Sequence, residues 1–327
     1  MAFETPSTEA IATGAIIKDW GDGPALRVRN EITRFNHRLR ETGLFEDEAL
    51  ARLLDTHPRD ELTICTMRPN PPAEERWIAG EARSLSGAEL VDAVKTGHLW
   101  VSPRHVMTVN PVYGEVFRRL MAEFAKATRT SITNQDGAII LSSPNMGIFF
   151  HVDPAETMLW HIRGHKTLRI YPPREDYVTE AALEAILLKE TLSDLPFRQE
   201  MEAEAAVEMV GPGEALSWPV HSPHRVLNGP DFNVSISIEY STPRSILTNG
   251  VFYLNGRLNR MTGKHLKSRG TPAALKPAYL MAAKALKTLY PLKSTVEARH
   301  ARQFDVDLTA KNCIRWRENR PVWALHE

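Results

Sequence analysis

One short run of the sequence, His151-Val152-Asp153, combines an imidazole and a carboxylate at a spacing that suits metal binding. Side chains alternate along an extended strand, so residues two apart point to the same side. Such a pair can hold one side of a metal ion and needs a further imidazole. About seventy residues on, His221 and His224 are both candidates. Two histidines and one carboxylate form the facial triad of non-haem Fe(II) oxygenases, which leaves coordination positions open.

The residues after the His-x-Asp run make the pattern more specific. Lys166 comes thirteen residues after Asp153, in a Gly-x-Lys turn, and the next apolar stretch ends at Pro172-Pro173. A Gly-rich turn at 210–213 then precedes another strand-like stretch, and His224 stands five residues past Pro219. Together these spacings resemble the Jumonji-C (JmjC) family of Fe(II)- and 2-oxoglutarate-dependent oxygenases, in particular its smaller cupin-like branch with the asparaginyl hydroxylases. The resemblance covers about residues 59–242.

The resemblance implies roles for four residues. His151, Asp153 and His224 would bind Fe(II), and Lys166 would pair with the distal carboxylate of 2-oxoglutarate. The family position selects His224 over His221, which would then lie at the mouth of the site or be structural. The competing interpretations are ordinary: a core histidine, a turn aspartate before a proline, and a solvated lysine on a strand.

Three more residues are weaker candidates for holding the cosubstrate. In the family, the residue four positions past the aspartate often contacts the oxoacid, and here it is Thr157. Ser237 alternates with Ser235 on one face of the last strand, and alternation from Thr157 favours His161 as an inward-pointing residue. Ile148 departs from the family pattern, because related hydroxylases often have a hydroxyl three residues before the first ligand.

The order of elements predicts a mainly β core with flanking helices. Short apolar segments separated by Pro, Asn and Gly are typical of an antiparallel barrel or double sheet, a double-stranded β-helix of the cupin or jelly-roll kind. Helices are expected at Pro111–Thr128, which is amphipathic, at 86–95, at 179–195 and at 277–290. Residues 31–54 also carry apolar residues at helical spacing. We therefore expect a mixed or helical segment at 1–58, a catalytic core at 59–242 and a basic helical extension at 243–327.

Bulk composition narrows the protein class without naming a partner. The chain has 327 residues, 43% of them hydrophobic, and its 40 basic and 40 acidic residues balance. Cys65 and Cys313 are too few for a disulfide framework, which favours a reducing compartment. The N-terminal residues resemble no signal peptide, and no apolar run is long enough to span a membrane. We expect a cytoplasmic protein that does not bind membranes.

The C-terminal region is strongly basic. Between Ser241 and Phe304 there are twelve Lys or Arg residues and one acid, Glu297. Such a stretch is usually a solvated face, or it pairs with the acidic 174–208 segment, within one chain or across a homodimer formed by the C-terminal helices. Contact with nucleic acid is the less favoured interpretation, since no aromatic interleaving or known module accompanies the charge.

The leading functional hypothesis is an oxygenase that uses O2, Fe(II) and 2-oxoglutarate to hydroxylate a protein side chain or a small molecule. The alternative is a cupin-like binding or regulatory protein that keeps the metal but has no turnover. Ile148 is the main feature that favours this alternative.

Overall fold

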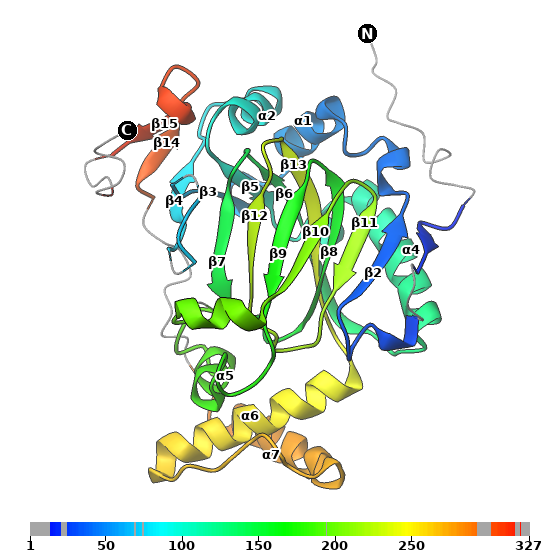
Figure 1. The fold of residues 1–327 in the computed structure, drawn as a ribbon, viewed down its shortest axis with the longest axis vertical. Helices are drawn as coiled ribbons and strands as arrows, with labels where there is room; N and C mark the ends of the chain where they lie inside the picture. The colour runs from blue at the N-terminus through cyan, green and yellow to red at the C-terminus, as the bar shows by residue number, and fades with distance from the viewer. Residues whose placement is uncertain are drawn as a thin grey trace.

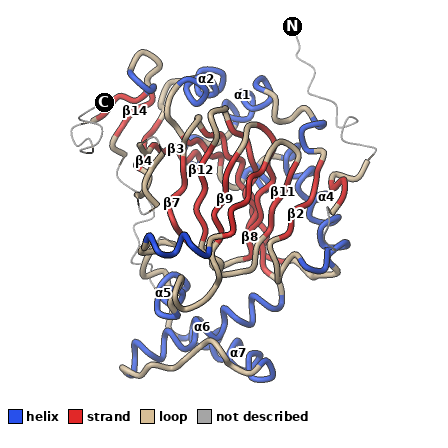
Figure 2. The backbone as a smooth tube through the Cα atoms, viewed as in Figure 1, coloured by secondary structure: helices blue, strands red, loops and turns tan. Residues whose placement is uncertain are grey.

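The computed structural model describes residues 14–20, 25–68, 70–73, 75–193, 195–292, 302–317 and 321. Its centre is a pair of sheets, one of eleven strands in the order β1-β2-β11-β8-β13-β6-β5-β3-β4-β14-β15 and one of four in the order β10-β9-β12-β7. Helices flank the large sheet, and α6 and α7 lie together at the bottom of Figure 1. Figure 2 shows the same division into strands and surrounding helices.

Eight consecutive strands build the jelly roll that the sequence predicts. Four belong to the large sheet: β6 (Thr133–Ser142), β8 (Glu156–Arg163), β11 (Glu214–Ser217) and β13 (Asn233–Ser241). The other four form the small sheet: β7 (Gly147–His151), β9 (Lys166–Ile170), β10 (Ala206–Val210) and β12 (His224–Asn228). The chain crosses between the sheets at nearly every connection, and all neighbouring pairs among these strands are antiparallel. The mainly β, double-stranded β-helix prediction is therefore confirmed.

The two faces of the large sheet have different partners. Along β8, Trp160 and its alternate neighbours join the main hydrophobic core. That core also takes in buried residues of α1 (Asp47–Thr56), α2 (Gly87–Thr96) and α4 (Pro111–Thr128). Leu159 points the other way and packs with Leu168 and Leu216 in a small cluster between the sheets. The metal and cosubstrate candidates lie on this inner face.

The N-terminal part contributes strands to the large sheet. The chain forms β1 (Ile17–Asp19) and β2 (Thr33–His37), and β2 pairs with β11. The helical interpretation of 31–54 is therefore wrong for its first part, and only α1 and a short 3-10 turn are helical there. The reason is tertiary: Phe35 is fully buried, with its ring 4.9 Å from that of Trp160, and this contact favours the period-two pattern of a strand.

The remaining elements surround this centre. The predicted helix Pro111–Thr128 has these bounds in the structure, and Ser86 caps α2 with Glu89. The 179–195 helix is shorter than expected, and the twenty-residue helix after the last core strand is expected only broadly, as part of the helical extension at 243–327. The other elements are β3 (Leu62–Thr66), β4 (Ile78–Glu81), β5 (Trp100–Pro103), α3 (Val106–Val109), α5 (Glu180–Leu187), α6 (Pro243–Thr262), α7 (Lys276–Leu289), β14 (Phe304–Val306), β15 (Ile314–Trp316), and 3-10 turns at Ala25–Arg27, Leu39–Thr42, Arg59–Glu61, Gln199–Glu204, Ala273–Leu275 and Lys311–Cys313.

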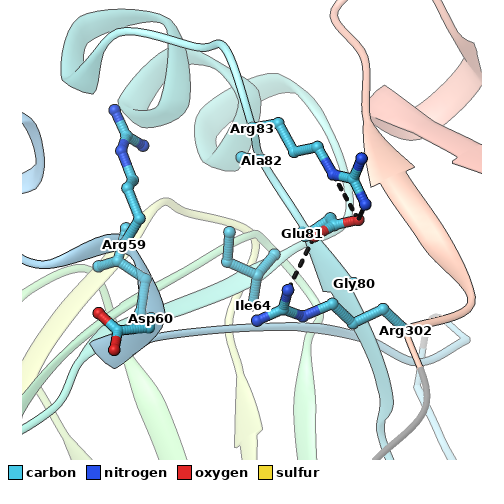
Figure 3. A pocket seen from close by; sticks show the side chains of 9 residues that line it. Arg59, Asp60, Ile64, Gly80, Glu81, Ala82, Arg83 and Arg302 are labelled. Atoms are coloured by element: carbon cyan, nitrogen blue, oxygen red, sulfur yellow. Dashed lines mark hydrogen bonds and ion pairs between the residues drawn. The ribbon is translucent and has the colours of Figure 1, made fainter.

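A cavity of about 320 Å³ lies at β3 and β4, on the helix-covered side of the large sheet (Figure 3). Glu81 accepts hydrogen bonds there from Arg83 and Arg302, and it also pairs with Arg317. The hydrogen bonds from Arg83 and Arg317 hold the pKa of Glu81 at about 2. Because Arg302 and Arg317 flank β14 and β15, these ion pairs attach the C-terminal hairpin to β4. None of the residues that line this cavity is a metal candidate.

The basic C-terminal region pairs with the acidic segment of the same chain. Arg260 binds Glu184 and Glu190 at 2.8 and 2.7 Å, and Arg269 binds Glu175 at 3.0 Å. This favours the internal-pairing interpretation of that charge. Lys293, Glu297 and Arg299 lie outside the described residues. Within the described part of the chain, no helix has the length and apolar character needed to cross a membrane.

Candidate metal centre and buried lysine

Three side chains far apart in sequence converge at one end of the space between the sheets. His151 ends β7, His224 begins β12, and the two are direct cross-strand partners. Asp153 follows β7, with its carboxylate 3.9 Å from His151 Nε2 and 3.5 Å from His224 Nε2. One ligand atom from each residue lies within 4.8 Å of the others. This is the geometry of three donors that can share one cation.

Backbone carbonyls set the orientation of both imidazoles. His151 Nδ1 lies 2.8 Å from the Phe149 carbonyl, and His224 Nδ1 lies 3.2 Å from the Ser222 carbonyl. Since a carbonyl can only accept, each Nδ1 must carry the proton, which leaves the Nε2 lone pair free toward the carboxylate. Burial lowers the pKa of His224 to about 4, so this ring is neutral at physiological pH. Neutral imidazole is the form that binds a metal.

A bulge in β7 decides where Ile148 points. His151 pairs with His224, but Ile148 pairs with Val226, so three steps on β7 match two on β12. The extra residue turns Ile148 onto the inner face with His151, opposite Val226, which packs against the cluster between the sheets. The position where the family often has a hydroxyl therefore faces the interior here and carries an aliphatic side chain.

Lys166 lies deeper in the same space. It is the first residue of β9, pairs with Asn228, and is 5% exposed. Gly164, at φ +77°, makes the turn that leads into β9, and a Cβ there would stand 2.6 Å from the Phe232 carbonyl oxygen. The Lys166 ammonium donates to Ser235 Oγ at 3.0 Å and forms no ion pair with any described acid. Burial without a counter-charge lowers the pKa of Lys166 to about 7.

His161 is a second buried polar group at the lysine end. It pairs with Ser235 across β8 and β13, is fully buried, and has no hydrogen-bond partner at either ring nitrogen. Burial lowers its pKa to about 3, and the nearby Lys166 charge adds to this. Buried polar atoms are nearly always paired in folded proteins, so these nitrogens and the lone ammonium together point to a missing polar ligand.

The other two weak candidates line the same face nearer the metal. Thr157 begins the inward-facing row of β8 and pairs with Glu239, while Ser237 pairs with Leu159. The Thr157 hydroxyl reaches only the Ala155 carbonyl, at 3.5 Å. Glu239 is accessible to solvent, yet desolvation by its neighbours raises its pKa to about 7, with smaller contributions from the charges of Asp153 and Asp136. Glu239 thus lies at the solvent-exposed end of this row on β13, and sequence reasoning missed it.

His221 does not join the triad. Its ring Nε2 lies 2.9 Å from Asn249 Oδ1 on α6, and its ring packs edge-on against Phe252. It is therefore structural, one of the two roles expected if His224 is the third ligand. A second omission of sequence reasoning is Trp218, whose ring lies 4.7 Å from that of His224. Its position six residues before a candidate ligand was the available signal.

Comparison with known proteins gives limited similarity. No protein-family profile matches the chain, and no curated protein matches it. Among solved structures, one of Escherichia coli YcfD is 17% identical with a TM-score of 0.46, covering 80% of this chain and 66% of that one. A structure titled as the E. coli ribosomal oxygenase YcfD is 15% identical with a TM-score of 0.41, and another, with cobalt and succinic acid, is 14% identical with a TM-score of 0.41.

The chain spans just under two thirds of the length of these structures, 65–66%. Because the sequence identities and TM-scores are low, the activity has to be argued from the site itself. The asparaginyl-hydroxylase branch stays a prediction.

Proposed function

We propose that this chain is an Fe(II)- and 2-oxoglutarate-dependent oxygenase that hydroxylates a C–H bond. The observation that carries the proposal is one inner sheet face that has three metal donors at one end and, at the other, a buried ammonium without a counter-charge among the described residues. A metal site alone would be consistent with several chemistries. The buried Lys166 ammonium on the same face has no counter-charge in the part of the chain that the structure describes, so an anionic ligand that contacts both the metal and this ammonium would fit the site.

The donor set fits Fe(II). His151 and His224 supply neutral imidazole nitrogens and Asp153 supplies a hard carboxylate, which together suit a six-coordinate ion with positions left open. The same donors would also hold zinc, as in metallohydrolases. Lys166 favours the oxygenase, because a hydrolytic zinc site has no need of a buried ammonium in the same space.

The residues around Lys166 fit a dicarboxylate. The pair His224–Ile170, level with the metal donors, and the pair Asn228–Lys166 are four positions apart, about 13 Å along the strand. In this proposal Lys166 and Ser235 bind the distal carboxylate, and His161 donates to it or to a bound water. Thr157 and Ser237 line the wall between Lys166 and the metal donors. A charged, hydrogen-bonded partner would offset the cost of burying the lysine.

When bound, the metal and 2-oxoglutarate supply the oxidation: the oxoacid and O2 become succinate, CO2 and one oxygen atom inserted into the substrate C–H bond. The protein's own part is to hold and orient the groups and to exclude water. The Phe149 and Ser222 carbonyls keep both Nε2 lone pairs directed at the metal position. Leu159, Leu168 and Leu216 form the apolar wall that keeps the interior dry.

The test is succinate release from 2-oxoglutarate by protein loaded with Fe(II) and ascorbate, without a prime substrate. Slow turnover is expected in the wild-type protein, and its loss is expected in Asp153→Ala. A matched control is Asp231→Ala, an exposed aspartate whose carboxylate contacts His165 at the surface. Absence of both oxoacid binding and succinate in metal-loaded wild-type protein would overturn the proposal.

The same assay decides the alternative of a non-catalytic metal-binding protein. Its specific support is Ile148, which faces Val226 on the inner wall where related enzymes often have a hydroxyl. If this alternative holds, the protein binds metal at the triad but neither binds nor consumes 2-oxoglutarate. We favour the oxygenase because an apolar residue at 148 changes nothing at the lysine end. Among the described residues, the Lys166 ammonium still lacks a counter-charge and the His161 ring still lacks a hydrogen-bond partner, and an oxoacid would supply both.

The prime substrate in this proposal is a protein side chain or a small molecule, as for the enzymes that the motifs resemble.

We also propose a homodimer through the C-terminal helices. Along α7 and at its start, Leu275, Met281 and Leu289 are 50%, 65% and 71% exposed. A helix with this much exposed apolar surface suits a second copy of itself. Light scattering should give a dimer mass for the wild type and a monomer mass for Met281→Glu with Leu289→Glu; a monomeric wild type would contradict this.

A further inference from the structure

Helix α6 contacts both loops that carry metal ligands, through one side chain. Asn249, in the first half of α6, donates from Nδ2 to the Pro154 carbonyl at 2.6 Å. Its Oδ1 lies 2.9 Å from His221 Nε2. Pro154 directly follows the ligand Asp153, and His221 precedes the ligand His224 by three residues. The amide therefore bridges the two loops that must stay together for the triad to form.

The hydrogen-bonding groups in this contact determine which atoms donate and which accept. The Pro154 carbonyl can only accept, so the amide nitrogen of Asn249 must face it and the amide oxygen must face His221. His221 Nε2 must then carry a hydrogen. Burial lowers the pKa of His221 to about 4, which keeps the ring in the neutral form that needs one donor and one acceptor nitrogen. The Asn249 amide satisfies both loops at once, because its donor and its acceptor lie side by side.

The His221 side of the bridge leads to the His224 ring. His221 has a left-handed backbone, φ 65°, in the turn between β11 and β12. A non-glycine residue in this region is held there by its surroundings. The next residue, Ser222, supplies the carbonyl that accepts from His224 Nδ1. Anchoring the His221 ring on α6 thereby holds the carbonyl that directs His224 Nε2 toward the metal position.

The Asp153 side of the bridge has a second attachment to the same helix. Thr242 caps the N-terminus of α6, and its hydroxyl donates to Glu156 at 2.5 Å. Pro154 and Glu156 are thus both tied to α6 just after Asp153. The segment between β7 and β8 cannot shift without breaking a contact to this helix.

We propose that Asn249 and His221 are positioning residues of the metal centre, and that α6 is part of the metal site although it supplies no ligand. The inference rests on the triad binding a metal and not on the oxygenase reaction. Partners that orient ligands without touching the ion typically change metal affinity by about 10- to 100-fold when removed.

The experiment measures Co(II) binding by titration calorimetry and by the visible absorption of the bound ion. Asn249→Ala should weaken Co(II) binding about 10- to 100-fold and alter the spectrum. His221→Leu should act similarly, and the double variant should lose no more than either alone, because both remove one bridge. His221→Gln keeps a donor amide and should recover part of the affinity.

Asn255→Ala is the matched control, because Asn255 is a buried asparagine on the same helix that contacts Lys267 and Ser268, away from the metal loops. It should lower the melting temperature but leave Co(II) binding unchanged. Wild-type Co(II) affinity in Asn249→Ala, or an equal loss in Asn255→Ala, overturns the inference. If Asn249→Ala does not fold, Asn249→Asp, which keeps the acceptor for His221 but loses the donor to Pro154, is held to the same two outcomes. Metal-loaded wild type that neither binds 2-oxoglutarate nor releases succinate would refute only the oxygenase proposal.

Discussion

The two ends of the inner face differ in how well the protein itself pairs their polar groups. At the metal end, His151 and His224 each have their second nitrogen satisfied by a carbonyl, and the free nitrogens face Asp153. At the lysine end, Lys166 has no acidic partner among the described residues, and His161 has no hydrogen-bond partner at either ring nitrogen. The first end is oriented by the protein's own backbone. The second has no counter-charge in the described part of the chain, and this contrast is why we propose a dicarboxylate ligand.

Removing the carboxylate at the metal end should have the largest effect. Asp153→Ala takes away the only charged ligand of the triad and should weaken Co(II) or Fe(II) binding by at least about 100-fold, since the two imidazoles alone hold a divalent ion poorly. Titration calorimetry checks this, with Asp231→Ala as control. Metal affinity like that of the wild type in Asp153→Ala would remove the triad assignment and with it the contrast.

Removing the charge of Lys166 should weaken cosubstrate binding without weakening metal binding. Lys166→Ala should raise the dissociation constant of 2-oxoglutarate by about 100-fold, because a buried charge pair is lost, while Co(II) binding stays within about 3-fold. Lys126→Ala, an exposed lysine on α4, is the control. Unchanged oxoacid affinity would move the cosubstrate site elsewhere, and a parallel loss of metal affinity would show that the two ends are not independent.

The unpaired lysine should also destabilise the ligand-free protein in a pH-dependent way. Its pKa is about 7 when folded and 10.5 unfolded, so below pH 7 both states are charged and the folded state bears the whole cost of burial. Between pH 7 and 10.5 the unfolded state binds more protons, so stability rises with pH, and above 10.5 the cost is gone. Lys166→Met should therefore stabilise the apoprotein by about 2–4 kcal/mol at pH 7 and less at pH 9.

Urea unfolding at the two pH values measures this difference. Saturating 2-oxoglutarate should narrow this difference by up to about 2.7 kcal/mol, because the wild type binds the ligand about 100-fold more tightly than Lys166→Met. If Lys166→Met is less stable than the wild type in the ligand-free protein, the lysine is satisfied by something the described residues do not include.

How well the sequence predicts a feature depends on how far apart in the chain the contacting residues are. The pairing of the metal candidates His151 and Asp153 and the Gly164 turn follow from local spacing, and strand punctuation is enough to predict the jelly roll. Phe35 was misassigned to a helix because its strand is decided by packing on Trp160, more than a hundred residues away. Asn249 could not be found, since nothing in its neighbourhood on α6 indicates a bond to Pro154. The direction of Ile148 depends on a bulge that only the pairing with β12 reveals.

The most direct test of the central claim is a crystal structure with iron and 2-oxoglutarate, with anomalous data collected at the iron absorption edge. We expect an anomalous peak among His151 Nε2, His224 Nε2 and Asp153, and oxoacid density that ends at the Lys166 ammonium. An anomalous peak elsewhere, or an oxoacid whose far carboxylate lies away from Lys166, would contradict the claim.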